Sequence, residues 1–209
     1  MSDKIKFDYV IPESKSEITV DEWVQFNKIH TVDVDPEFLQ KRMLEIFCKV
    51  PSEYSTKLAQ VRVNDMLNRL TILFSQNSDL KQRFTFKNIE WGLIPDFSKH
   101  ITTGELIDLD SYLESGDYTR LLSILYRPII KSYKDSYDIE PYEGSHELFK
   151  TLPYDILDGV LVFFWTLFNQ LGKATLKYTK KVMEKEKDLI LVEKVNSLLN
   201  GEDIQSLFT

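Results

Sequence analysis

The sequence predicts a mainly α fold, a single helical domain with one small β-hairpin and extended terminal arms. Among its 209 residues are only seven glycines and seven prolines, too few for the many turns of a β-sandwich. Apolar residues recur at three- and four-residue steps through most of the chain, which is typical of amphipathic helices. We expect an N-terminal arm over residues 1–17, a helical domain over 18–200 and a C-terminal tail over 201–209.

Helix start signals mark the first half of the chain. Thr19 and Glu22 have the spacing of a capping box, in which each side chain accepts a hydrogen bond from the other residue's backbone N–H. Asp35 before Pro36 indicates a second start, with the aspartate as cap and the proline at the first helical position. Apolar residues between positions 58 and 74 then predict a long amphipathic helix.

The strongest strand pattern covers residues 83–92, where polar residues alternate with aromatic or β-branched ones. A short hairpin around Asn88 is expected, closed by Pro95. Phe97 follows and is interpreted as an anchor into the core.

A second capping box, formed by Thr102 and Glu105, predicts a helix that ends near Gly116. The helix after it is expected to be cut off by Pro128, because proline disfavours helical backbone at the preceding residue. Residues 131–144 are rich in charged residues, Ser, Tyr, Pro and Gly, and are interpreted as an exposed loop.

The most hydrophobic element is predicted over residues 154–171. Its segment 160–165 is apolar on every side, so we expect a central helix buried all round, too short and too interrupted by polar residues to span a membrane. The lysines of 173–188 could face DNA, but interleaved acids favour a solvated helix with internal pairs. Leu207 and Phe208 could dock on a neighbour as an apolar hook, or stay free or dock on their own chain.

Composition argues against several classes of function. The formal net charge of −7 disfavours sequence-independent DNA binding, which needs clustered Lys and Arg. Cys48 is the only cysteine, so no intramolecular disulfide forms, and it is expected to be a buried apolar residue. The three histidines lack zinc-site spacing, and no P-loop or nucleophile-elbow motif is present. We expect no catalytic residues, no cofactor and no metal.

Three acids, Glu105, Asp108 and Asp110, invite a metal or acid–base interpretation. Two carboxylates can hold a divalent ion or flank a substrate. The favoured interpretation is structural, because acids in the first turn of a helix complement its dipole and cap free amides.

Arg127 follows an apolar helix face and precedes a proline. An arginine at such a position can cap the last carbonyls of the helix or bind a carboxylate through two N–H groups. We expect it to pair with one of four acids and to lock residues 140–144 onto the body. These acids are Asp108, Asp110, Glu140 and Glu143.

Three motifs follow one another between residues 101 and 144: I-T-T-G-E-L-I-D-L-D-S-Y, then L-Y-R-P-I, then E-P-Y-E-G, before a Phe-Phe-rich helix. Their order resembles small helical head–tail proteins of tailed bacteriophages, in particular structural proteins of crAss-like phages. The resemblance covers roughly residues 89–171. It implies a virion or assembly role and no reaction.

The first functional hypothesis is therefore a phage virion structural protein, made in the host cytoplasm and located at the neck or tail as a ring or portal-associated component, or packaged in the particle. It would act by contact with portal, tail or ring subunits and with further copies of itself, without membrane or direct nucleic-acid binding. The alternative is a tail assembly chaperone that the finished virion does not retain. An enzyme that uses the acids of 105–110 is the third hypothesis.

Overall fold

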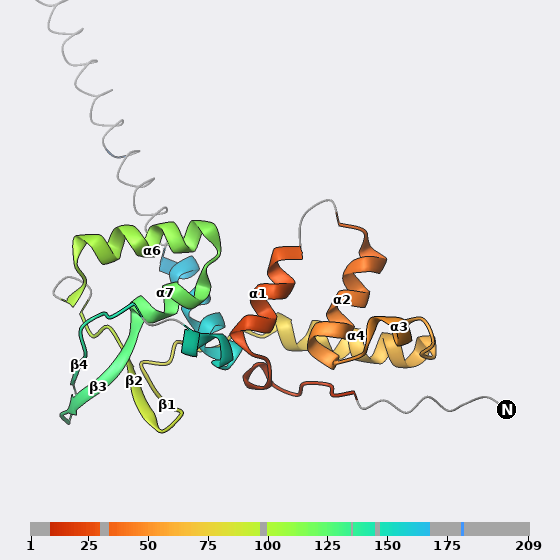
Figure 1. Cartoon of the computed structure of the whole chain (residues 1–209), viewed down its shortest axis with the longest axis horizontal. Helices are drawn as coiled ribbons and strands as arrows, with labels where there is room; N and C mark the ends of the chain where they lie inside the picture. Colours follow the sequence, from red (N-terminus) through yellow and green to blue (C-terminus); the bar gives the residue numbers. More distant parts are fainter. Residues whose placement is uncertain are drawn as a thin grey trace, which may run out of the picture. The chain divides into compact units, whose positions relative to one another are not determined.

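The computed structural model describes residues 9–29, 34–96, 100–134, 136–144 and 147–167, together with Lys181. The chain divides into two compact units, Met1–Val162 and Phe163–Thr209. Nearly all described residues belong to the first, which is shown in Figure 1 and called unit 1 below. Phe97, His30, His146, Leu207 and Phe208 lie outside the described residues, as does the lysine-rich segment except for Lys181.

The fold is mixed α/β, so the prediction of a mainly α domain with one hairpin was wrong. Of the described residues 59% are helical and 14% lie in strands. The helical elements are η1 (Lys15–Glu17), α1 (Val20–Ile29), α2 (Pro36–Cys48), α3 (Ser52–Ser55), α4 (Gln60–Ser75), α6 (Thr103–Ser115), α7 (Tyr118–Leu125) and η2 (Glu147–Thr151), followed by helical residues 154–167. The strands are β1 (Arg83–Phe86), β2 (Ile89–Leu93), β3 (Tyr126–Ser132) and β4 (Tyr137–Ile139).

Both predicted starts in the first half of the chain are confirmed. Glu22 N–H donates to Thr19 Oγ1 at 3.3 Å, and Thr19 N–H donates to Glu22 Oε2 at 2.8 Å. The Asp35 carboxylate accepts from Phe38 N–H at 3.0 Å, directly before Pro36 begins α2. These local bonds satisfy N–H groups that a helix start otherwise leaves open.

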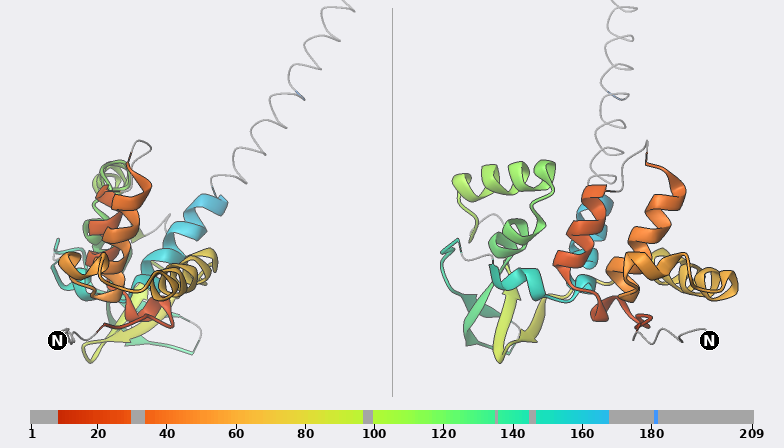
Figure 2. Two further views of the ribbon diagram at one scale, coloured as in Figure 1. Left: turned by 90° about the vertical axis from the view of Figure 1, so that its right-hand side faces the viewer. Right: turned by 45° about the vertical axis from the view of Figure 1, so that its right-hand side comes forward.

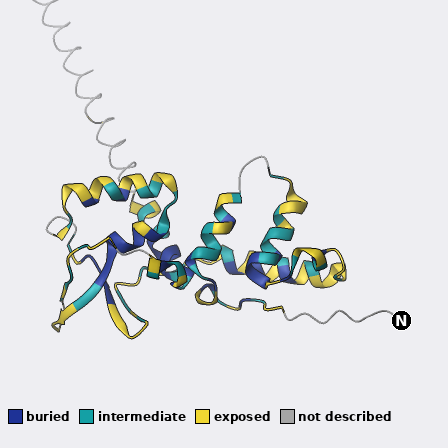
Figure 3. Ribbon diagram, viewed as in Figure 1, coloured by how far each residue is buried: buried dark blue, intermediate teal, exposed yellow. Residues whose placement is uncertain are grey.

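An aromatic cluster joins α1, α2 and α4 to the helix that begins at residue 154. The Trp23 ring stacks on Tyr154 with centroids 4.4 Å apart, and Phe47 and Phe74 are 5.0 Å apart. Phe26 packs against Phe47 at 5.2 Å. Figure 3 shows buried residues at the base of these helices, where this core lies.

The four strands form one antiparallel sheet in the order β1-β2-β3-β4. The predicted hairpin around Asn88 is confirmed: Lys87 and Asn88 both have positive φ, at 49° and 63°, as a two-residue type I′ turn requires.

The prediction of an exposed loop over residues 131–144 was wrong for the first part of this range, where the structure has the end of β3 and all of β4. Pro128 does end a helix, but α7 passes into β3 with no residue between Leu125 and Tyr126. The restriction that proline places on Arg127 favours extended backbone, which is the conformation of a strand as well as of a loop.

One face of the sheet is fastened by Tyr137. Its ring lies over Gly92, where an added β-carbon would meet Tyr137 Cδ2 at 2.9 Å. Its hydroxyl donates to the Leu93 carbonyl at 2.6 Å, and the Arg83 guanidinium lies 4.3 Å from the ring centroid. A residue of edge strand β4 is thereby tied to β1 and β2.

A helix buried on all sides was expected over residues 154–171. Its described part, residues 154–167, is only partly buried. Tyr154, Leu157 and Val160 are buried, but Phe163 is 37% and Trp165 71% exposed. Residues 160–165 are all apolar, so the sequence contains no polar residue that would mark where the buried part of the helix ends.

A buried ion pair connects this helix to the N-terminal segment. Lys15 is 6% exposed and contacts Asp158 at 2.6 Å as well as the Gln76 carbonyl. The Asp158 carboxylate also accepts from Tyr154 Oη at 3.2 Å and Ser78 N–H at 2.9 Å. Lys15 lies within residues 1–17, which were predicted to form an extended N-terminal arm.

Candidate functional site

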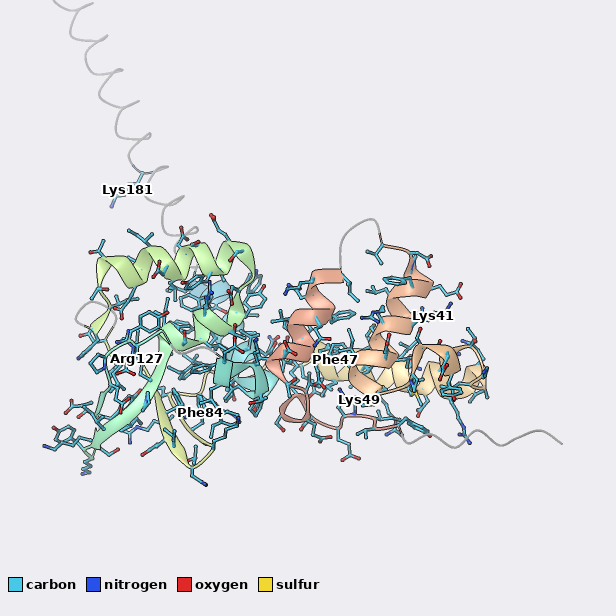
Figure 4. The ribbon with its side chains drawn as sticks, in the orientation of Figure 1. Lys41, Phe47, Lys49, Phe84, Arg127 and Lys181 are labelled. Atoms are coloured by element: carbon cyan, nitrogen blue, oxygen red, sulfur yellow. The ribbon has the colours of Figure 1, made fainter. Side chains whose placement is uncertain are left out.

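Arg127 is a buried charged residue of the sheet, with only 6% of its surface exposed. Its Nη2 donates to Glu105 Oε1 at 2.7 Å and its Nε to the Ile124 carbonyl at 3.2 Å. The Tyr142 ring centroid lies 5.8 Å from the guanidinium carbon. One side chain thus connects α6, the end of α7 and residues 140–144 (Figure 4).

Glu105 takes part in two interactions at once. Its Oε2 accepts from Thr102 N–H at 2.7 Å, and its own N–H donates to Thr102 Oγ1 at 3.2 Å, so the predicted capping box is present. Its other oxygen, Oε1, accepts from Arg127. Because both oxygens are engaged and the residue is only 9% exposed, its carboxylate is not placed as a solvent-facing acid or base.

The partner predicted for Arg127 was wrong. In the structure Arg127 pairs with Glu105, which was predicted only to cap its own helix. The capping spacing hid the long-range role, because a carboxylate has two oxygens and the box needs only one. The acids expected to pair with it were Asp108, Asp110, Glu140 and Glu143. The expected attachment of residues 140–144 instead uses the Tyr142 ring and a hydrogen bond from Glu140 N–H to the Pro128 carbonyl at 3.0 Å.

A hollow of about 250 Å³, called the sheet hollow below, lies beside Arg127. Its apolar lining includes Trp91, Pro128, Tyr142 and Phe149, whose ring packs edge-on against Trp91 at 5.1 Å. The carboxylates of two further lining residues add negative charge; these residues are Glu140 and Glu143. Apolar surface combined with a few charged groups is the usual composition of a binding site.

A larger hollow, of about 460 Å³, lies between α1, the turn joining α6 to α7, and η2. Its charges alternate in sign, with Asp21, Asp117 and Glu147 near Lys28 and Lys150. Lys150 Nζ lies 2.7 Å from Glu147 Oε2, and its hydrogen bond to this carboxylate is the main cause that raises the pKa of Lys150. Within this lining, Lys150 is paired with Glu147.

Three further observations concern groups elsewhere in the described residues that could carry chemistry. Within the described ranges no three His, Cys, Asp or Glu side chains converge as metal ligands. Cys48 is buried, and that burial raises the pKa of its thiol to about 11. His100, the one histidine in the described part of the chain, lies 3.1 Å from the Asp96 carbonyl in an exposed position.

No described helix is both long and apolar enough to cross a lipid bilayer.

Comparison of the chain with protein-family models, with curated proteins and with solved structures gave no match.

Proposed function

We propose that this chain is a structural protein of a tailed bacteriophage particle and acts by protein–protein contacts. It would lie at the neck or tail, as a ring or portal-associated component, or be packaged inside the particle. Its partners would be portal, tail or ring subunits and further copies of itself. The chain would be made in the host cytoplasm and then built into the virion.

One structural relationship carries the proposal. Each of the three motifs that resemble phage head–tail proteins supplies one member of a connected set. Glu105 comes from the first motif, Arg127 from the second and Tyr142 from the third. The motifs therefore describe a packing unit that holds α6, β3 and residues 140–144 together, as a contact protein needs, rather than a set of reacting groups.

Exposed apolar residues on unit 1 support a role in contacts. Leu106 and Ile107 are neighbours on α6 and are 52% and 64% exposed, although helix α6 is otherwise anchored through Glu105 and Leu109. Ile89 at the hairpin end is 41% exposed beside the sheet hollow. Clustered apolar surface of this kind is typical of interaction sites, whereas single exposed apolar residues are ordinary.

Subunit contacts that form rings join two different surfaces of the same chain. A surface on one copy must then fit a second, unlike surface on its neighbour. The outer side of α6, with the exposed Leu106 and Ile107, and the sheet hollow are two unlike apolar surfaces on separate elements of unit 1. Both also carry acids, so each would meet a surface of opposite charge on its neighbour. The net charge of −7 favours protein partners over direct binding to the packaged DNA.

The test is quantitative mass spectrometry of gradient-purified virions of the source phage. A fixed copy number equal to that of the portal, or a multiple of it, is expected for a ring or portal-associated subunit, and a much larger number for a packaged protein. Abundance in infected cells combined with absence from virions would reject the structural role and support a tail assembly chaperone.

A further inference from the structure

The two edge strands of the sheet differ in how well they could pair with another chain. The pairing of β4 with β3 is interrupted by a register shift between Ile129 and Lys131, and Pro141 follows shortly after β4 ends. Bulges and prolines are features that keep a sheet edge from pairing with another strand. β1, at the other edge, is in regular register with β2 and contains neither. The tip of the β1–β2 hairpin extends beyond the helices of unit 1 in the views of Figures 1 and 2.

The backbone of β1 directs hydrogen-bonding groups at two positions away from the sheet. Leu93 N–H donates to the Gln82 carbonyl at 2.9 Å, and this bonded pair comes directly before the pair of Arg83 with Gly92. Bonded and non-bonded pairs alternate along an antiparallel ladder, so the N–H and carbonyl groups of Arg83 and Thr85 point outward. Within the described residues these backbone groups have no other hydrogen-bond partner.

A second copy of β1 fits this edge. With the two strands antiparallel and Phe84 opposite Phe84 of the second copy, Arg83 of each copy meets Thr85 of the other. Every outward N–H and carbonyl group then has a partner. The two Phe84 side chains form a non-hydrogen-bonded pair, the kind in which side chains lie closest, and aromatic pairs across strands are stabilising. Phe84 is only partly buried by Tyr126, whose ring centroid is 5.0 Å from its own.

Charge favours this register over its two neighbours. Moving the twofold axis to Thr85 would place Arg83 opposite Lys87 of the second copy, a turn residue whose φ is 49°. Moving the axis to Arg83 would place the two Arg83 residues opposite each other. Like charges directly opposite each other destabilise a pair of strands. The axis at Phe84 avoids both pairings and is therefore the register in which β1 complements itself.

We infer that β1 pairs with β1 of a second copy across a twofold axis at Phe84, which joins the two sheets into one continuous sheet. The contact uses the same surface on both copies, so it closes at two copies. A strand pair of this length buries little surface, and the dimer is therefore weak and depends on concentration. The inference goes beyond the proposed function, because contacts around a ring would have to use other surfaces.

The first test is sedimentation of the purified full-length chain over a concentration series. Thr85→Pro removes an outward N–H that β2 does not use, a position at which an edge strand tolerates proline. It is expected to weaken association about tenfold or more. Thr85→Val keeps the N–H and is the matched control, which should leave association unchanged. Circular dichroism of the two variants compares their folding.

The second test detects the register by cross-linking and does not depend on the proline variant. Chains with Arg83→Cys are mixed with chains with Thr85→Cys under mild oxidation. The two positions oppose each other in the inferred pair, with Cα atoms about 5.5 Å apart, which suits a disulfide. In either variant alone the two new cysteines are offset by two residues and lie more than about 7 Å apart, too far to bond. The native Cys48 is buried and is common to all samples.

Weaker association of Thr85→Pro, together with cross-links that form only in the mixture, supports the inference. A chain that is monomeric at every concentration overturns it, as does a folded Thr85→Pro variant that associates as tightly as the Thr85→Val control. Cross-links that form in either variant alone but not in the mixture would reject this register. Because the purified chain is used, these outcomes are independent of whether the virion contains the protein.

Discussion

The Tyr137 ring lies so close to Gly92 that no side chain fits between the two residues. An added β-carbon on Gly92 would meet Tyr137 Cδ2 at 2.9 Å and Ile129 Cγ1 at 3.0 Å. Glycine inside a strand often marks such a close approach. Gly92 thereby permits Tyr137 to cross from β4 and bond to the Leu93 carbonyl on β2.

Gly92→Ala is therefore expected to lower the free energy of unfolding by roughly 1–3 kcal/mol, the usual cost of overpacking. Denaturant unfolding of the purified chain measures the change. In a Tyr137→Ala background the same substitution should cost less, because the overlapping ring is gone. Equal costs in the two backgrounds would show that Tyr137 does not occupy this space.

Gly104→Ala is the control for that measurement. Gly104 lies in the first turn of α6, and the nearest atom to an added β-carbon is Thr102 Oγ1 at 4.0 Å. Alanine at this open helical position should raise the free energy of unfolding, by up to about 1 kcal/mol.

Arg127→Met should destabilise the chain strongly, by roughly 3–5 kcal/mol, because it leaves the Glu105 carboxylate buried and unpaired. Glu105→Gln removes that charge and keeps a side chain able to complete the capping box. The double variant is accordingly expected to lose less stability than the two single losses added together. Arg69→Met, at an exposed pair with Asp65, should change stability by less than about 1 kcal/mol.

Lys15→Met tests how the N-terminal segment is held. Asp158 would keep its bonds from Tyr154 and Ser78 but lose its only cationic partner in the described structure. We expect a loss of roughly 3 kcal/mol in the free energy of unfolding, with faster proteolytic cleavage near residues 9–17. Unchanged stability and cleavage would mean that residues 9–17 attach through their backbone alone.

Burial raises the pKa of the Cys48 thiol from 9.0 to about 11, which predicts a pH dependence. The folded-state pKa lies above the unfolded value, so the stabilising contribution is complete below pH 9 and is lost as the pH rises through 11. Burial also raises the pKa values of Tyr126 and Tyr154. The free energy of unfolding should thus fall from pH 9 to pH 11, with a smaller fall in Cys48→Ala. Equal falls would exclude a contribution from the thiol.

The local elements were predictable because their causes are local. The capping boxes at Thr19 and Thr102, the cap at Asp35 and the turn at Asn88 each depend on residues within four positions of one another. Gly116, predicted to end a helix, does so with φ at +70°, a conformation that glycine adopts without strain.

The sheet beyond its first hairpin was not predictable in the same way. β3 pairs with β2 across more than thirty residues of sequence, as Trp91 with Pro128 shows. Residues 126–132 do not by themselves distinguish a strand from a loop. Pro128 is compatible with either, and the segment ends in the polar residues Lys131 and Ser132. The ion pair of Arg127 with Glu105 was missed for a different reason, since the capping role of Glu105 already accounted for its carboxylate.

The direct passage from α7 to β3 leaves no loop residue between Leu125 and Tyr126 to absorb a movement of the helix relative to the strand. A movement of α7 is passed through the peptide bond between Leu125 and Tyr126 to β3, an inner strand of the sheet. A slip of β3 by one residue would exchange its two faces, moving Arg127 away from Glu105. Any displacement of α7 that shifts the register of β3 would therefore also break the Arg127–Glu105 ion pair.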